Sequence, residues 1–189
     1  MRYMMIITAV LLVLFLPLSA QDTVGDQVLM EKAKLEIFDR NWNNALEKLE
    51  QLLSDYPESP YYSRAMFYKG RCLKQMEQPR KALAVYEMFL KISDNDALKE
   101  EATIAIIDIK YSLYEQGEPR RLKQVKEYLD SSIELVRFYA AFKLSYVRDK
   151  SEARAAVPVL KKIIQEKDDQ DLVDRAKVAL LRIHPDHLK

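Results

Sequence analysis

Apolar residues recur with a helical period along residues 28–90, in four segments separated by short polar turns. In the first segment, Ala33 and Ile37 lie four residues apart, which places them on one face of a helix. Asn41 and Pro79 mark the turns inside the first and the second pair of segments. The pattern predicts four amphipathic helices arranged as two antiparallel hairpins.

The second hairpin repeats the first at an offset of 37 residues. Small residues fall on small ones, because Ala33 aligns with Gly70 and Ala45 aligns with Ala82. A helical unit repeated in tandem indicates a repeat architecture, in which neighbouring units bury a continuous core. We therefore expect Ala45 and Ala82 at the contact between the two helices of each hairpin.

These residues resemble two tetratricopeptide repeats, QVLMEKAKLEIFDRNWNNALEKLEQLLSDYP and SRAMFYKGRCLKQMEQPRKALAVYEMFLKIS. The resemblance rests on alanine early in each second helix, at Ala45 and Ala82, and on Pro57 after the first hairpin. The link DYPESPYYSRA is similar to that of members of the family in the bacterial envelope. The resemblance implies helical hairpins whose first helices line a concave groove that holds an extended peptide or a partner helix.

The second half of the chain carries a repeat of different spacing. Ala102, Ala140 and Ala176 occupy the same place in three apolar stripes, at periods of 38 and then 36 residues. Residues 132–183 resemble HEAT repeats, including Pro158 near the start of a second helix. The segment before them, residues 97–130, is either HEAT-like as well or a degraded third tetratricopeptide hairpin.

These patterns predict an all-α fold, a right-handed α-solenoid of antiparallel hairpins with about nine helices, four and then five. The composition agrees, because three glycines and 31% charged residues suit amphipathic helices better than sheets. We expect two tetratricopeptide-like hairpins over residues 21–96. HEAT-like repeats are expected over residues 97–189, with a helix that caps the solenoid near its C-terminal end.

Residues 1–20 have the pattern of a secretory signal peptide. Arg2 precedes an uncharged apolar run over residues 4–16, and Ala20 supplies a small residue at the expected cleavage site. A membrane-spanning helix needs roughly 20 apolar residues, so we expect cleavage, with a retained anchor as the alternative. The mature protein is then expected in the periplasm or cell envelope without a membrane span, and residues 21–27 form a short mobile lead.

No combination of residues points to catalysis, a metal or a cofactor. Cys72 is the only cysteine, and neither His184 nor His187 has a partner at metal-ligand spacing. The three glycines stand apart, so the sequence offers no glycine-rich phosphate loop. The formal net charge of +1 does not favour nucleic acid. We therefore expect a protein that is not an enzyme, without metal, cofactor or nucleic-acid partner.

The groove that the tetratricopeptide resemblance implies supplies the candidate binding site. Arginine offers forked contacts to carboxylates and phenylalanine offers an apolar seat, so we expect a protein or peptide partner of acidic character. The alternative is that the cations are merely solvated and that the phenylalanines pack against the next helix. The candidate residues are Met30, Lys34, Phe38, Arg64, Phe67, Arg71 and Lys74.

The predicted function is that of an exported, non-catalytic scaffold or adaptor that binds a peptide or partner protein in the cell envelope. One alternative is an accessory or sensory subunit that docks on an envelope complex through the HEAT-like half. Another is a degenerate enzyme or an enzyme accessory. A pocket that joins three or more polar side chains would weaken the scaffold hypothesis.

Overall fold

The computed structural model describes residues 19–183, with side chains described from residue 25, and this part of the chain is entirely helical. It forms two compact units, residues 1–78 and 79–189, which we describe one at a time. Within each unit consecutive helices pack against one another, as in a helical-repeat solenoid. The expected signal peptide lies outside the described residues, apart from its last two.

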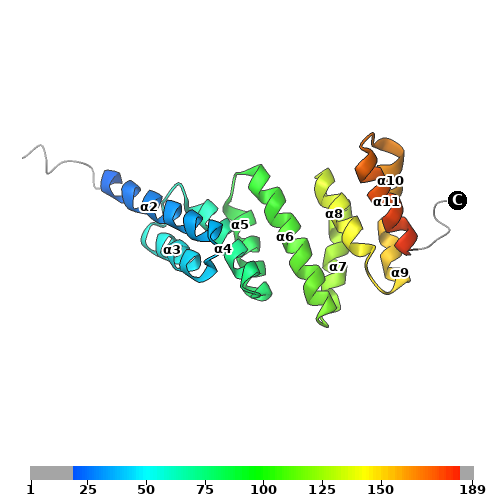
Figure 1. The fold of residues 1–189 in the computed structure, drawn as a ribbon, viewed down its shortest axis with the longest axis horizontal. Helices are drawn as coiled ribbons and strands as arrows, with labels where there is room; N and C mark the ends of the chain where they lie inside the picture. The colour runs from blue at the N-terminus through cyan, green and yellow to red at the C-terminus, as the bar shows by residue number, and fades with distance from the viewer. Residues whose placement is uncertain (1–18, 184–189) are drawn as a thin grey trace, which may run out of the picture. The chain divides into compact units, whose positions relative to one another are not determined.

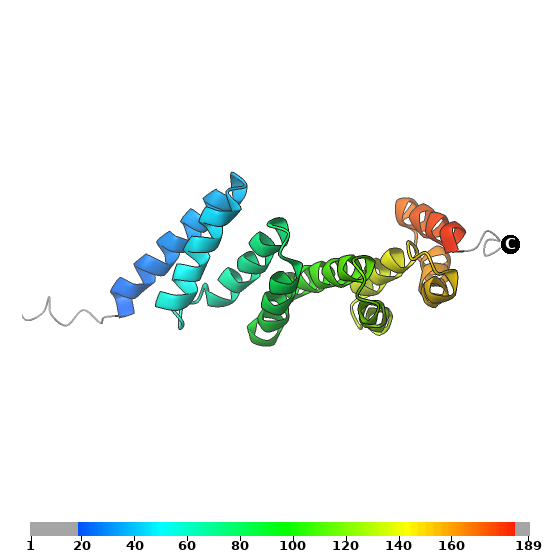
Figure 2. The ribbon, with the colours of Figure 1, turned by 90° about the horizontal axis from the view of Figure 1, so that it is seen from below.

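Unit 1 contains the first three helices of the repeat pattern (Figure 1). Helix α2 packs along α3 in the opposite direction, and α3 packs on α4 (Figure 2). Ala33, Ala45 and Ala65 are fully buried in the shared core beside Leu49 and Leu52, so small residues stand where these helices meet. The elements are α2 (Ser19–Phe38), α3 (Trp42–Asp55) and α4 (Tyr62–Gln75).

The expectation of a mobile lead over residues 21–27 is wrong, because α2 already begins at Ser19. Contacts with the link that follows α3 explain the difference. Asp26 is 2% exposed and accepts a hydrogen bond from Ser59 Oγ at 2.6 Å. A side chain at Gly25 would collide with the Tyr56 hydroxyl, so glycine permits this close approach. The polar composition of the segment gave no sign of these long-range contacts.

Unit 2 continues with seven α-helices and two short 3₁₀ segments within the described residues (Figure 1). Helix α7 runs directly into η1, and α9 runs through η2 into α10, so each run acts as one helical segment. The elements are α5 (Pro79–Ile92), α6 (Asp96–Glu115), α7 (Arg120–Lys126), η1 (Glu127–Asp130), α8 (Glu134–Leu144), α9 (Lys150–Ala153), η2 (Arg154–Ala156), α10 (Val157–Glu166) and α11 (Gln170–Ile183).

Counted in this way, the described chain has nine helical segments, which confirms the prediction of four and then five. Pro158 lies in the first turn of α10, where its missing N–H costs nothing. The predicted boundary between the two repeat types, between residues 96 and 97, stays a prediction. The division after residue 78 shows which helices form a compact unit and does not test the type of repeat.

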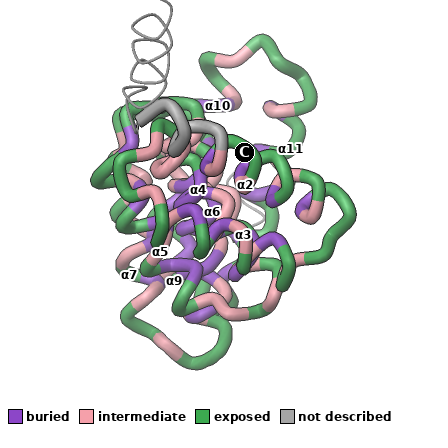
Figure 3. The backbone as a smooth tube through the Cα atoms, turned by 90° about the vertical axis from the view of Figure 1, so that its left-hand side faces the viewer, coloured by how far each residue is buried: buried purple, intermediate pink, exposed green. Residues whose placement is uncertain are grey.

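The recurring alanine of the second half forms the centre of its packing. Ala102, Ala140 and Ala176 are all fully buried, on α6, α8 and α11 respectively. Buried and exposed positions follow one another along the helices (Figure 3), as an amphipathic period requires. Leu144, Leu160 and the other apolar residues of this core are almost fully enclosed.

Three helices end in the same left-handed turn. Arg40, Glu77 and Gly117 have φ of 60°, 56° and 99°, and they follow α2, α4 and α6 respectively. In each turn the left-handed residue donates to the carbonyl three residues earlier, and the next residue donates to the carbonyl five residues earlier. This is the Schellman arrangement, which satisfies the last helical carbonyls. Helix α8 ends instead at Ser145 in right-handed geometry, so the type of turn changes after the hairpin of α6 and α7.

Candidate functional site

The C-terminal end of α2, the start of α3 and one face of α4 enclose a surface cavity of about 470 Å³ in unit 1. We call it the Trp42 cavity. Three of its side chains are cationic, three are aromatic and none is acidic, so it offers positive charge next to apolar surface. The lining residues are Lys34, Ile37, Phe38, Arg40, Trp42, Tyr68 and Arg71.

The left-handed turn after α2 builds one wall of the Trp42 cavity. Arg40 N–H donates to the Ile37 carbonyl at 3.1 Å, and Asn41 N–H donates to the Glu36 carbonyl at 2.8 Å. The chain therefore reverses at once, and α3 starts at Trp42 beside the end of α2. Phe38 is left 85% exposed at this end. Phe38 thus offers apolar surface beside the cationic side chains of the same cavity, and a partner can cover it.

Helix α4 supplies the opposite wall through Tyr68 and Arg71, which lie one turn apart on one face. The neighbouring Lys69 forms an ion pair with Glu50 of α3 at 2.8 Å, which helps to hold α4 in place. Tyr68 packs partly against the core of unit 1. The wall is thus a fixed helix face with an exposed guanidinium on it.

The charges of the Trp42 cavity are only partly compensated. Lys34 pairs with Glu31 on the same helix at 2.7 Å, in a solvent-exposed contact that contributes little. Among the residues that the structure describes, no carboxylate forms an ion pair with Arg40 or Arg71. Two guanidiniums beside exposed aromatic surface can therefore take carboxylates from outside the unit.

The structure separates the seven candidate residues into three groups. Lys34, Phe38 and Arg71 line the Trp42 cavity. Arg64 is exposed and Lys74 is half-buried, both on α4, and neither lines it. Met30 and Phe67 form the third group.

The expectation that Met30 and Phe67 offer accessible apolar surface is wrong. Met30 is fully buried in the core of unit 1, because it lies one turn before Ala33 on the stripe of α2 that faces α3. Phe67 is only 2% exposed and closes a run of three buried residues on α4.

Arg40, Trp42 and Tyr68 also line the cavity, and the sequence analysis did not select them. Arg40 and Trp42 flank the turn that the sequence does mark at Asn41. The signal that could have found them is their place at that turn, since helix ends bring such residues together. Tyr68 carries no such signal, because an aromatic residue within a helix usually belongs to the core.

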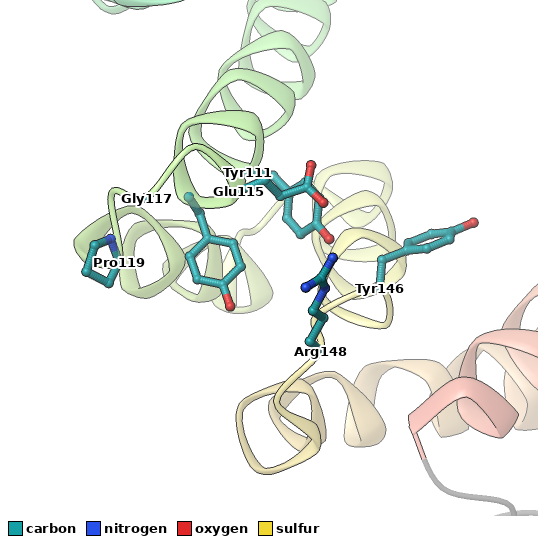
Figure 4. Close-up of a pocket in the computed structure, with 7 residues that line it drawn as sticks. Tyr111, Glu115, Gly117, Pro119, Tyr146 and Arg148 are labelled. Carbon is teal, nitrogen blue, oxygen red and sulfur yellow. The ribbon is translucent and has the colours of Figure 1, made fainter.

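A second cavity of about 400 Å³ lies in unit 2, at the end of α6 and next to the loop after α8. We call it the Tyr111 cavity. In Figure 4 the Arg148 side chain points toward Tyr111 and Glu115, whereas the Tyr146 ring points away. The lining residues are Tyr111, Tyr114, Glu115, Gly117, Pro119, Tyr146 and Arg148.

Five polar side chains line the Tyr111 cavity, so it has the arrangement expected to weaken the scaffold hypothesis. Burial raises the pKa of Tyr111 to about 12, and the hydrogen bond to Glu115 contributes in the same direction. The phenol therefore stays protonated at neutral pH and cannot serve as a base. Lys143 Nζ lies 5.7 Å from the centre of the Tyr111 ring and donates to Asp108 at 2.6 Å, and Asp108 also accepts from Tyr139 Oη at 2.5 Å. This group of residues has the character of a structural network.

No other chemistry gathers in the described part of the chain. Burial raises the pKa of the Cys72 thiol to about 11, so it is not a nucleophile at neutral pH. Residues 19–183 contain no group of three or more histidine, cysteine or acidic side chains placed to hold a metal ion. Both histidines lie outside the described residues. Within the same range, no helix combines the length and the apolar character needed to cross a bilayer.

Comparison with known protein families supports the repeat assignment of the first half. The tetratricopeptide repeat family matches residues 27–59 and 64–95, which are the two hairpins of the duplicated pattern. Searches of curated proteins and of solved structures found no match. The N-terminal half thus carries two tetratricopeptide repeats, which indicate a scaffold for protein–protein interaction, and no catalytic family is indicated.

Proposed function

We propose that this chain is an exported, non-catalytic scaffold of the cell envelope that holds an acidic segment of a partner protein in the Trp42 cavity. The observation that carries the proposal is the pair of uncompensated guanidiniums, Arg40 and Arg71, beside the exposed ring of Phe38. The two repeats in the same segment agree with a role in protein binding.

The energetic argument starts from Phe38. Covering a phenylalanine side chain that is otherwise exposed contributes about 1.5–3 kcal/mol. That contribution requires an apolar side chain on the partner, next to its charges. Arg40 and Arg71 then discriminate, because a planar guanidinium takes a carboxylate through two parallel hydrogen bonds and repels a cation. The preferred partner is an extended segment that combines carboxylates with large apolar residues.

Trp42 provides a direct assay, because it is the only tryptophan of the chain and lines the cavity. An acetylated peptide in which glutamate alternates with leucine is titrated into the full chain while tryptophan emission is recorded. We expect a saturable change in emission, which becomes weaker as salt is added. The same peptide with lysine in place of glutamate should produce no change.

Two variants on one helix sharpen the test. Arg71→Glu reverses a charge inside the cavity, and Arg64→Glu reverses an exposed charge on the same helix outside it. We expect Arg71→Glu to weaken binding by about tenfold or more, which corresponds to about 1.4 kcal/mol. Arg64→Glu should leave the affinity nearly unchanged. Equal losses in both variants would show that the peptide senses only overall charge, and the proposed site would be abandoned.

Export is supported by the pattern of residues 1–20, since a positive start, an apolar run and a small residue at position 20 are typical of a signal peptide. Cleavage after Ala20 would remove only the first two residues of α2. The mass of the protein isolated from an envelope fraction of the expressing cells should correspond to a chain that begins at Gln21. Recovery of the uncleaved chain from the cytosol alone would contradict export.

For the second half, we propose that the HEAT-like repeats begin at α8. The left-handed turn at Gly117 follows the pattern of the first two hairpins, which favours a third tetratricopeptide-like hairpin over residues 97–130. The change of turn geometry after α8 supports a change of repeat type at that point.

A further inference from the structure

A second surface that is both cationic and aromatic lies in unit 2, between the end of α8 and the outer face of α11. It surrounds a cavity of about 320 Å³. On α11, Arg175, Val178 and Arg182 follow one another at intervals of three and four residues, so they form one stripe. The lining residues are Phe142, Tyr146, Asp174, Arg175, Val178 and Arg182.

The two arginines of the stripe lie over aromatic rings of the α8 end. The Arg182 guanidinium carbon is 4.3 Å from the centre of the Tyr146 ring, and that of Arg175 is 5.6 Å from the centre of the Phe142 ring. A guanidinium stacked on a ring uses its flat face, and its N–H groups remain available at the edge. The rings therefore hold these donors in place for a ligand that approaches from the side.

The acidic residues nearby do not cancel this charge. Asp174 accepts from Gln170 Nε2 at 2.7 Å and pairs with Lys177 at 3.1 Å, and these bonds keep the pKa of its carboxyl below the usual range. Arg175 and Asp171 are 3.6 Å apart, in a solvent-exposed pair of small energetic value. Arg182 forms no ion pair with any carboxylate that the structure describes.

Tyr146 connects this cavity to the Tyr111 cavity, because its side chain lines both. Arg148 follows two residues later and points into the Tyr111 cavity, toward Tyr111 and Glu115 and away from the Tyr146 ring (Figure 4). Arg148 is exposed and has no ion pair within the described residues. The exposed Tyr146 thus borders both the cavity that Arg148 lines and the cavity that Arg182 lines.

Apolar side chains next to these charges are also uncovered. Tyr146 is 56% exposed, Val178 is 47% exposed and Leu181, one turn after Val178 on α11, is 46% exposed. The exposed face of α11 thus carries apolar side chains among its charges. Arginine and tyrosine around a small apolar centre are the composition of binding hot spots.

We infer that this region, the Tyr146 surface (Phe142, Tyr146, Arg148, Arg175, Val178 and Arg182), is a second protein-binding site. Its occupant is an extended segment in which two carboxylates flank a large apolar side chain. The carboxylates meet Arg148 and Arg182 on the two sides of Tyr146, and the apolar side chain covers Tyr146 and Val178. The site is independent of the Trp42 cavity, so the chain can hold two acidic segments at once.

The experiment uses the full chain and a fluorescein-labelled peptide in which glutamate alternates with leucine, followed by fluorescence anisotropy. The variant Arg40→Glu/Arg71→Glu serves as the background in which the Trp42 cavity no longer binds. We expect this background to retain one saturable site, and peptide binding there should leave the tryptophan emission unchanged, since Trp42 lines the first cavity and not the second.

Arg148→Glu in that background should weaken the remaining binding by about tenfold or more. Arg148 is the residue to change because it is exposed and forms no described ion pair. Since the new carboxylate lies on the side of Glu115, circular dichroism of the variant checks that the fold is retained. Lys161→Glu is the matched control: Lys161 is exposed on α10, has no described ion pair, and gives the same change of charge. This control should bind within about twofold of the background, because Lys161 lines neither cavity and salt screens an exposed charge.

Two outcomes would overturn the inference. The first is a background variant that binds no peptide, and the second is an equal loss of affinity in Arg148→Glu and Lys161→Glu. Neither outcome touches the Trp42 result, which is read from tryptophan emission in the unaltered chain. Conversely, a chain whose Trp42 emission never responds, but which still binds one labelled peptide through Arg148, refutes the proposed function and supports the second site.

Discussion

Replacing Glu77 by glycine should stabilise the protein more than the same replacement at Arg40. Both residues stand in the left-handed region, with φ of 56° and 60°, directly after the last turn of α4 and of α2. Gly117 occupies the same place after α6, with φ of 99°. Glycine takes this conformation without steric cost, whereas a residue with a Cβ does not.

Three contributions set the magnitude. The left-handed conformation costs a residue with a side chain about 1–2 kcal/mol, which glycine removes. Glycine also gives the unfolded chain more conformational freedom, which lowers the free energy of unfolding by about 0.4–1 kcal/mol. The helix dipole contributes about 0.3–1 kcal/mol, because a helix C-terminus favours a cation and disfavours an anion. Removing the anion Glu77 therefore adds this amount to the stability, and removing the cation Arg40 subtracts it. We therefore expect Glu77→Gly to stabilise by about 1 kcal/mol and Arg40→Gly to be close to neutral.

Urea unfolding followed by circular dichroism measures the difference. With a slope of about 1–3 kcal/mol per molar urea, the Glu77→Gly midpoint should rise by about 0.3–1 M. Glu47→Gly, an exposed position inside α3, is the control and should lose about 1 kcal/mol, because glycine is a poor residue within a helix. A Glu77→Gly midpoint at or below that of Arg40→Gly would refute the reasoning about the shared turn.

Three further predictions concern packing, a buried hydrogen bond and pH. Ala45→Leu should overpack the fully buried contact of α2 with α3 and lower the free energy of unfolding by about 1–3 kcal/mol. Trp42 fluorescence in urea measures this loss. The control, Ala84→Leu at an exposed position of α5, should leave the free energy of unfolding almost unchanged. Ser59→Ala removes the donor to buried Asp26 and should cost about 1–3 kcal/mol in the same assay. Because the fold raises the pKa of Tyr111 from 10.0 to about 12, it favours the protonated phenol, so stability should fall as pH rises through this interval. Tyr111→Phe should make that fall shallower in urea titrations at each pH.

The sequence was sufficient for the repeat pattern because that pattern is written in local spacing. Ala102, Ala140 and Ala176 are buried as the helical period requires, and so are Ala45 and Ala82. Each of these inferences needed only the distance between residues along one helix. The number and order of the helices followed from the same spacing.

The start of α2 could not be predicted in this way. Residues 21–27 are polar and include Gly25, which favours an irregular segment when only neighbours are considered. The helix is supported by contacts that span the first hairpin, where Ser59 donates to Asp26 and Tyr56 lies against Gly25. Tertiary contacts of this kind override local preference.

The lining of the proposed binding site was predicted only in part, because the family alignment identifies helix positions and not helix ends. Lys34, Phe38 and Arg71, which that alignment selects, line one cavity. Arg40 and Trp42 reach the same cavity through the left-handed turn, and a pattern of helical faces carries no information about a turn. The left-handed backbone conformation of these turns could not be predicted from the sequence either, since neither Arg40 nor Glu77 is a glycine.

The strained turn at Arg40 also bears on the function. Three hairpins use this turn, and one of them has the residue that costs least there, Gly117. Arg40 occupies the same position at a conformational cost of about 1–2 kcal/mol, which the helix dipole offsets only in part. Glu77 bears the same strain outside the Trp42 cavity, so the strain alone does not identify a binding residue, whereas the place of Arg40 in the lining of that cavity does. Arg40→Gly should therefore leave stability nearly unchanged and weaken capture of the acidic peptide, whereas Glu77→Gly should raise stability and leave capture intact. Equal peptide affinities in the two variants would show that the guanidinium has no part in binding.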